Sequence, residues 1–263
     1  MVMELDEKAV ERVAIDALLP LADSVLIDSD DWVQLRTPSL RDGSGNGVYL
    51  ARMAGAEVED RVAEVIAEHR ERGANFRWFV GPSSTPTDLP ERLERAGVRL
   101  FGRALGMSMR VPEQVPDLPA ATELRPVRTA ADVERFAELS MRAWEREPNF
   151  AEEVARAATR MLRRDDDAQR SWVLWHEGEA VGVTTLRLLR ATGIGYFQGA
   201  AVLPERRRAG LYRAMLLDRL GLLRRLGLEH AVIWANERTS AGSGQRVGFG
   251  VRCRGTFFEW RCP

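Results

Sequence analysis

Short runs of β-branched and aromatic residues alternate along the chain with segments in which apolar residues recur every three or four positions. In the first half, the apolar positions Val58, Val62, Val65 and Ile66 predict an amphipathic helix. The pattern for this half is strand, helix, strand, helix, strand, over residues 47–51, 58–72, 76–80, 87–97 and 98–111. The alternation predicts an α/β fold.

A proline-rich segment interrupts this pattern near the middle of the chain. Pro112, Pro116 and Pro119 lie among small and polar residues, and proline disfavours both helix interiors and central strands. We therefore predict a linker over residues 112–122 that separates an N-terminal domain, 1–111, from a C-terminal domain, 123–263. The length of 263 residues suits two domains of ordinary size.

The second half predicts a strand at 123–127, helices at 130–144 and 151–164, and a hairpin formed by 172–175 and 180–186. A strand over 194–202 follows, and Gly199 within it favours a β-bulge. A long helix, a buried strand at 230–235, a polar loop with a weak helix at 236–247 and closing strands over 249–261 complete the chain. Arg219 falls inside the apolar stripe of the long helix, so its charged end is expected to extend to water.

Charge and composition narrow the classes of partner. The 38 basic and 39 acidic residues nearly cancel, so no overall field favours nucleic acid or a membrane surface. No apolar run approaches the roughly 20 residues of a membrane span, and the acidic N-terminus does not resemble a signal peptide, so a cytoplasmic location is expected. Cys253 and Cys262 lie in what reads as a C-terminal strand pair, and we predict that both are free thiols.

The turn between the strand at 194–202 and the long helix is a candidate anion site. It reads Val202-Leu-Pro204-Glu-Arg-Arg-Arg-Ala-Gly210, and it leads into the first turn of a helix, where the backbone amides have no intrahelical partner. Gly210 has no side chain, so a phosphate can approach the backbone closely. A diphosphate suits the site. Nucleotides also bind at strand-to-helix turns, and a solvated basic helix start is the other interpretation.

These residues resemble the acetyl-CoA signature of the GNAT superfamily of N-acetyltransferases. Its core, Arg/Gln-x-x-Gly-x-Gly/Ala, corresponds to Arg207-Arg-Ala-Gly-Leu-Tyr212. A second signature, a strand ending in Asn and a short helix ending in Gly-Phe, is similar to Trp234-Ala-Asn236 followed by Gly248-Phe249. The resemblance covers about half the chain and implies a mixed, mostly antiparallel sheet flanked by helices.

The resemblance also implies acetyl-CoA as co-substrate and an amine of a small molecule as acceptor. The sequence lacks the spacing of metal ligands, so no metal is expected. In the family fold, the fourth strand, here 194–202, separates from the fifth, here 230–235. The backbone groups left unpaired there bind the pantetheine arm. The implied coenzyme contacts are Ala200, Ala201, Val202, Arg207, Arg208, Ala209, Gly210, Leu211, Tyr212 and Asn236. Asn236 is equally interpreted as a turn residue that bonds its own backbone.

The catalytic groups depart from the family pattern. Tyr212 stands where the signature has Gly or Ala, and Gly244 stands where many members carry the tyrosine that protonates the departing thiolate. Ser240 or Ser243 are candidates to hold a water or the thiolate instead, although serines in such a loop are usually solvated. The resemblance therefore leaves the general acid open.

The general base is open as well. Tyr196 occupies the strand position where some relatives keep a catalytic glutamate, and it is a candidate proton relay or a cavity wall. Trp144, Glu145 and Glu147 lie in the segment that lines the acceptor side in the family, so Glu145 is a candidate base, and Trp144 and Glu147 are candidate acceptor contacts. A charged helix end is the alternative for both glutamates.

The N-terminal half resembles the degenerate repeat of tandem members of the superfamily, which lacks the arginine–glycine turn; an unrelated α/β unit is the alternative. We therefore predict two GNAT-like domains, in a monomer or homodimer, of which only the second binds acetyl-CoA. The sequence also leaves two other functions open: a non-catalytic acyl-CoA sensor or partner-binding module, and a nucleotide-binding protein.

Overall fold

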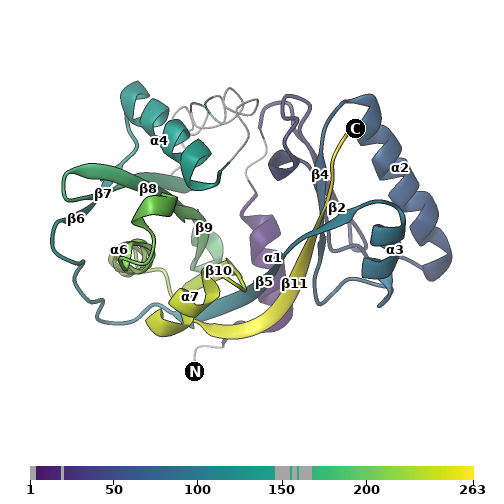
Figure 1. Cartoon of the computed structure of the whole chain (residues 1–263). Helices are drawn as coiled ribbons and strands as arrows, with labels where there is room; N and C mark the ends of the chain where they lie inside the picture. The colour runs from purple at the N-terminus through teal and green to yellow at the C-terminus, as the bar shows by residue number, and fades with distance from the viewer. Residues whose placement is uncertain (1–3, 19–20, 146–154, 156–158, 160–167) are drawn as a thin grey trace. The chain divides into compact units, whose positions relative to one another are not determined.

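The computed structural model describes residues 4–18, 21–145, 155, 159 and 168–263. Tertiary contacts divide the chain into two compact units (Figure 1). Unit 1 comprises Met1–Leu5 and Met107–Arg252, and unit 2 comprises Asp6–Gly106 and Cys253–Pro263. Each unit is a sheet flanked by helices, which confirms the predicted fold class.

Unit 1 contains the segment with the candidate anion site. Its strands follow the order β5-β10-β9-β8-β7-β6. Neighbouring strands from β6 to β9 are antiparallel, whereas β9 and β10 are parallel and are connected through helix α6. The elements are β5 (Arg99–Arg110, of which 107–110 lie in this unit), β6 (Thr122–Pro126), α4 (Ala130–Ala143), β7 (Gln169–His176), β8 (Glu179–Leu189), β9 (Ile194–Val202), α6 (Leu211–Arg225), β10 (His230–Asn236) and α7 (Ala241–Val247).

Helices α4 and α6 pack against opposite faces of this sheet. Successive residues alternate between the faces, so Ala201 packs with α4 and Val202 with α6. On β8, Val183 packs with α4 and Val181 with α6, because the register of β7 and β8 shifts between them. A capping box fixes the start of α4, because Thr129 and Asp132 each bond the backbone of the other. Because α4 and α6 pack on opposite faces, both sides of β8 and β9 are buried.

Strand β9 is irregular at the point that matters for the site. Its register with β8 shifts by one residue, from Val183↔Ala201 to Thr185↔Gln198, and Gly199 has φ +53°. This is the predicted β-bulge, and glycine permits the left-handed conformation. On the other side, within two strands that the structure describes in full, the register with β10 pairs only Ile194, Gly195 and Tyr196. Beyond Tyr196 the two parallel strands separate.

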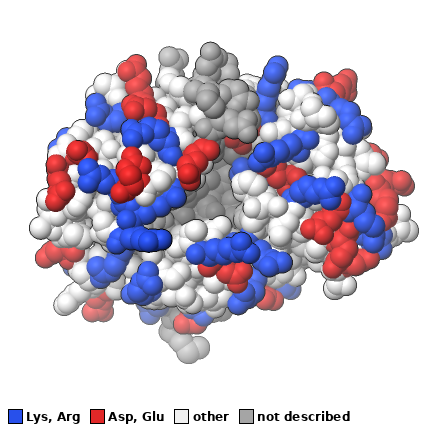
Figure 2. Space-filling model, viewed as in Figure 1, with Lys and Arg blue, Asp and Glu red and all other residues white. Residues whose placement is uncertain are grey.

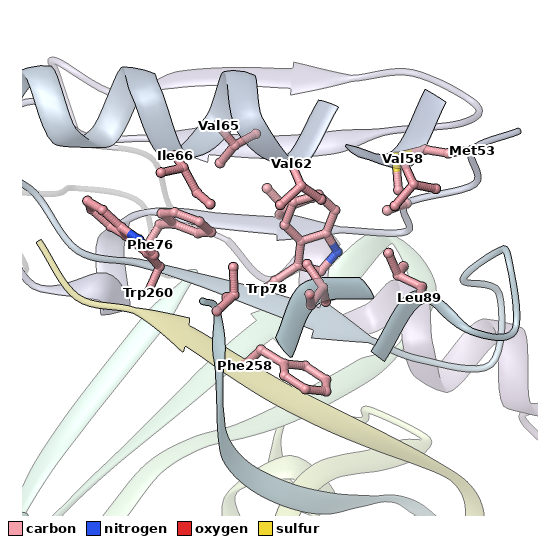
Figure 3. Packing of buried hydrophobic residues seen from close by; sticks show 14 residues of the cluster. Met53, Val58, Val62, Val65, Ile66, Phe76, Trp78, Leu89, Phe258 and Trp260 are labelled. Atoms are coloured by element: carbon pink, nitrogen blue, oxygen red, sulfur yellow. The ribbon is translucent and has the colours of Figure 1, made fainter. Parts of the chain in front are cut away.

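In unit 2 the strands follow the order β1-β2-β3-β4-β11-β5. Its core contains Phe76 and Trp78 from β4 and Phe258 and Trp260 from β11, and Figure 3 shows the apolar face of α2 pointing toward them. The elements are α1 (Glu7–Asp16), β1 (Val25–Asp28), β2 (Val33–Arg36), β3 (Gly47–Tyr49), α2 (Val58–Glu71), β4 (Phe76–Val80), α3 (Leu89–Arg95), β5 through Gly106, and β11 (Gly250–Trp260) from Cys253 onward.

The strands of the two units are connected and paired in the same way. Strand β3, helix α2 and parallel strand β4 repeat the arrangement of β9, α6 and β10, and each is followed by a short helix, α3 or α7. In both sheets the strand before the parallel pair is antiparallel to it. This common topology supports the interpretation of the first half as a GNAT-like repeat.

In each unit, one strand comes from the opposite half of the sequence. The neighbour of β4 is β11, at the end of the chain, and the neighbour of β10 is β5, from the first half. Residues 253–263 therefore belong to unit 2, and residues 107–110 belong to unit 1. These units differ from the expected domains, 1–111 and 123–263, at both of these strands.

Several local expectations need correction. The predicted C-terminal strand pair is a single strand, β11, although both cysteines are free as predicted. Helix α1 and strands β1 and β2 were not predicted. Of the expected helix at 151–164, only Ala155 and Thr159 are described, and both are helical. On the face shown in Figure 2, basic and acidic side chains are interspersed. No helix in the described part of the chain is long and apolar enough to cross a membrane.

Candidate functional site

The turn before α6 presents backbone amides at an open helix end. Arg208 and Gly210 both have left-handed backbone conformations, with φ of +71° and +74°. Gly210 is the N-cap residue and provides no side chain to cap the helix. The amide of Ala214 makes the helical bond to the Gly210 carbonyl, at 3.1 Å, so the amides of Leu211, Tyr212 and Arg213 precede the first intrahelical bonds. This geometry suits a bound diphosphate.

The three arginines of the turn have different surroundings. Arg206 forms an ion pair with Glu179. Arg207 binds backbone carbonyls: its Nε donates to Val202 at 3.2 Å and its Nη2 donates to Ala143 at 2.9 Å. Arg208 is exposed and has no partner among the described residues. Of the predicted phosphate ligands, Arg208 is therefore the available one, and Arg207 instead connects the end of β9 to the end of α4.

Arg213 is a basic residue that the sequence analysis missed. It lies exposed in the first turn of α6, three residues after Gly210, and it too has no partner within the described residues. The family signature ends at residue 212, so the signature could not identify it. The positive end of the helix dipole and two available guanidinium groups thus lie at the same turn.

The splay between β9 and β10 exposes backbone groups to a ligand. Ala200 is half-buried, and the side chains of Ala201 and Val202 are buried, so what these residues offer a ligand is chiefly backbone. The carbonyl of Val202 already accepts the bond from Arg207. Its predicted role in binding pantetheine is therefore limited to its N–H.

At the end of β10, Asn236 makes a turn with its own side chain. Its Oδ1 accepts hydrogen bonds from the amides of Arg238 and Thr239, at 3.0 and 3.1 Å. Nothing in the described residues accepts from its Nδ2. Both interpretations of Asn236 therefore remain compatible, since the carbonyl shapes the turn and the amide group can donate to a ligand.

Tyr212 bridges the start of α6 and the start of α7. Its ring packs beside Ala200 and Val202, and its hydroxyl bonds the side chain of Ser240, which precedes α7. Burial raises the pKa of the Tyr212 hydroxyl, and the nearby charge of Arg219 opposes this increase. The bulky residue at this signature position therefore fills the space beside the phosphate turn.

Gly244 cannot supply the acid that its position carries in many relatives. It lies buried within α7, and a Cβ added there would be 3.4 Å from the side chain of Met107. Glycine has no side chain, so this position carries no group that could protonate the thiolate. The general acid therefore has to come from another residue or from solvent.

The predicted acceptor residues lie on the face of the sheet that packs against α4. Tyr196 pairs with Arg187 across β8 and β9 and is 9% exposed, and the Arg187 Nε donates to Gln198 at 2.7 Å. Trp144, 40% exposed, lies next to the bulge, because a Cβ added at Gly199 would be 3.8 Å from its ring. Tyr196, Trp144 and the bulge are thus on neighbouring elements.

Glu145 follows Trp144 in a left-handed conformation, φ +50°, and its carboxylate lies 3.6 Å from Nη2 of Arg207. The Glu145 carboxylate therefore already contacts the arginine that connects β9 to α4. Glu147, the remaining predicted acceptor contact, lies outside the described residues. Within those residues, no group of three His, Cys, Asp or Glu side chains is placed to hold a metal ion.

Arg219 is buried, which corrects the expectation that it extends to water. Its side chain is 0% exposed; Nε donates to the carbonyl of Met215 at 2.9 Å, and Nη1 donates to the carbonyl of Thr185 at 3.0 Å. The guanidinium lies 4.3 Å from the ring centroid of Phe197. Burial lowers the pKa of Arg219 to about 10, so it is still charged at neutral pH.

Comparison with known proteins shows which family the second half of the chain resembles. Residues 133–249 match the family model described as acetyltransferase (GNAT) family. This match runs from α4 through the turn before α6 to Phe249, and it contains both predicted signatures. Residues 133–249 are therefore similar to the GNAT family of acetyltransferases.

Solved structures with the same fold cover nearly the whole chain. A GCN5-related N-acetyltransferase from Kribbella flavida has a TM-score of 0.67 at 14% identity, over 98% of this chain and 96% of that one. A functionally unknown conserved protein from Staphylococcus epidermidis has 0.69 at 12% identity, over 92% and 96%. A tandem GNAT protein from the clavulanic acid biosynthesis pathway has 0.60 at 14% identity, over 96% and 87%. No curated protein matches the chain significantly.

Proposed function

We propose that the protein is an N-acyltransferase that transfers acetyl from acetyl-CoA to the amine of a small molecule. The observation that carries this proposal is the coincidence, in one unit, of an uncapped helix end and a splayed parallel strand pair. The first suits a diphosphate and the second suits a peptide-like arm, and coenzyme A contains both. A nucleotide would use only the helix end.

The described residues fit the coenzyme in two places. The amides of residues 211–213, together with Arg208 and Arg213, would hold the diphosphate. The unpaired edge of β9 beyond Tyr196 would bond the amides of the pantetheine arm, with Asn236 donating from the end of β10. This arrangement directs the thioester toward the bulge at Gly199.

The acceptor amine would attack the thioester carbonyl directly, within a ternary complex. An amine that arrives as an ammonium ion must first lose a proton, because the protonated nitrogen has no lone pair. Tyr196, on the α4 face near the bulge, is the proposed relay of that proton to water. Glu145 is the weaker candidate because Arg207 pairs with it. Most of the rate acceleration would come from the orientation of the amine toward the thioester and from backbone N–H groups that bond the thioester carbonyl.

A second candidate function is a non-catalytic acyl-CoA sensor. The buried Gly244 favours it, since this position offers no acid for the thiolate. Both functions require coenzyme binding, so binding alone does not separate them.

Release of free thiol from acetyl-CoA separates the two functions. The full chain would be incubated with acetyl-CoA and a panel of small primary amines, with each amine omitted in turn as a control. We expect amine-dependent thiol release with at least one class of amine. Tight binding of acetyl-CoA without thiol release across a broad panel would support the sensor and refute the transferase.

A further inference from the structure

A positive charge is buried between helix α6 and strands β8 and β9. The guanidinium of Arg219 extends from α6 to the underside of the sheet, and it has no exposed surface. Among the described residues no carboxylate forms an ion pair with it, and its Nη2 has no hydrogen-bond partner. Burying a charge without a counterion is costly, because the charge loses its hydration. Such an uncompensated cation needs an explanation.

The position of Arg219 connects it to the bulge. Its Nη1 binds the carbonyl of Thr185, where the register of β8 and β9 shifts, and its guanidinium stacks on Phe197. Phe197 is the first residue of β9 beyond the last pair with β10. The cation therefore lies on the α6 side of the backbone where the strands separate, which is where the proposed function places the thioester.

Few other charges lie near this cation. On α6, Tyr212 and Asp218 interact with it electrostatically, and Arg225 interacts with Asp218. On α7, Arg246 bonds Ser243, and on β6, Glu123 pairs with Arg125 at the surface.

On β8 and β9, Arg187 and Tyr196 lie on the opposite face of the sheet, toward α4. Burial raises the pKa of Asp218, so its carboxyl compensates the cation less effectively.

We propose that Arg219 is the fixed positive charge that stabilises the departing coenzyme A thiolate. This inference rests on the proposed function. In the transfer step, the amine nitrogen forms a bond to the carbonyl carbon and the carbon–sulfur bond breaks. Sulfur leaves with the electron pair, and the proton from the amine reaches it through water. A cation in a medium of low dielectric constant favours that anion without contact, because its field is weakly screened.

The charge state of bound coenzyme A tests this inference without measuring turnover. Calorimetry would give the affinity of the full chain for free coenzyme A and for desulfo-coenzyme A, which lacks the sulfur, from about pH 7 to about pH 9.5, across the titration of an ordinary thiol near 8.5. A nearby cation lowers the pKa of the bound thiol, and the thiolate then binds more tightly than the thiol. The ratio of the two affinities should therefore rise with pH.

The magnitude follows from the shift expected for one neighbouring charge. A decrease of one unit in the pKa of the bound thiol raises the affinity ratio by up to about tenfold across this range. Arg219→Met removes the charge and keeps a long apolar side chain, so the ratio should become independent of pH while desulfo-coenzyme A binds as before. Arg219→Lys places a cation with a lower pKa at the same buried position, so the rise should be smaller than in the wild type.

Arg224→Met is the matched control, since Arg224 is exposed on the same helix. It should behave as the wild type does. Arg219→Met removes a buried charge that has no ion-pair partner in the described residues and keeps a long apolar side chain, so the variant should fold. If Arg219→Met does not fold, the pH dependence of the affinity ratio in the wild type and in Arg219→Lys still tests the inference.

An affinity ratio that does not change with pH in the wild type would overturn the inference, as would an unchanged rise in Arg219→Met. These outcomes would leave the proposed function standing, because both ligands would still bind. Failure of the wild type to bind either ligand at any pH would instead refute the proposed function, and this inference with it.

Discussion

At the residue scale, two glycines provide a matched test of the phosphate turn. Gly210 and Gly227 lie at opposite ends of α6 with φ of +74° and +69°, and a Cβ added at either meets no atom within 4 Å. Alanine should therefore cost both positions the same backbone strain, about 1 kcal/mol. Only at Gly210 would the methyl group approach the diphosphate. We predict that Gly210→Ala weakens acetyl-CoA binding at least tenfold, whereas Gly227→Ala leaves the affinity unchanged.

Calorimetry would give the affinities, and urea unfolding would give the stabilities. Equal affinities for the two variants would mean that the ligand does not approach the turn at Gly210. A large loss in both would point to the fold and not to the site.

Tyr196 is the second residue with a direct test. The change Tyr196→Phe removes only the hydroxyl from a side chain that is 9% exposed, so the packing of β9 should persist. We predict a lower kcat at an unchanged KM for acetyl-CoA, because a proton relay acts on the amine and not on coenzyme binding. Steady-state kinetics with an accepted amine measures both. Equal kcat would remove Tyr196 from the mechanism.

The sequence predicted these residues unequally well. The turn at 207–212 was identifiable because a signature ties Arg, Gly and a helix start to fixed spacings. The burial of Arg219 was not, because helical periodicity gives the direction of a side chain but not the depth of its environment. The hydrogen bond from Arg207 to Ala143 could not be predicted either, since the two residues are far apart in the sequence.

At the scale of elements, the missing predictions have local causes. The side chains of β1 are mostly exposed, so the strand lacks the alternation that marks a half-buried strand. Helix α1 has four buried positions, among them the charged Glu11, which weakens its apolar stripe. The long elements β9, α6 and β10 were predicted well, because burial on one or both faces makes their patterns strong.

Glu11 makes the stability of unit 2 dependent on pH. Its side chain is 1% exposed; Oε2 accepts from the amide of Ser83 at 3.1 Å, and Oε1 is buried without a partner in the described residues. Burial raises the pKa of Glu11 above 4.5, its value in the unfolded chain. The folded state therefore holds the proton more tightly, and stability decreases as pH rises from 4.5 through the folded-state pKa.

We predict that Glu11→Gln becomes more stable relative to the wild type as pH rises through this window, and that the two converge in stability below it. Urea unfolding at pH 4, 6 and 8 measures the difference. Glu7→Gln, at an exposed position of the same helix, is the control and should show no such trend. A difference that is constant with pH would mean that Glu11 does not titrate within the fold.

At the scale of the whole molecule, the exchange of strands explains why the linker did not mark the division between units. Residues 112–122 do follow β5, as the prolines indicate. The last strand, however, begins in unit 1 and ends in unit 2. Local patterns identify a strand but not its partner, so no reading of single segments could assign β11 to β4. Truncation at the predicted boundary, residue 123, would remove a strand from each sheet.

Calorimetric titration of acetyl-CoA into the full chain tests the central claim, that backbone amides at the start of α6 bind a diphosphate beside the β9–β10 splay. We predict saturable binding with one site per chain, and weaker binding of ATP, which lacks the pantetheine arm. Absence of measurable binding of acetyl-CoA, or tighter binding of ATP than of acetyl-CoA, would contradict the claim.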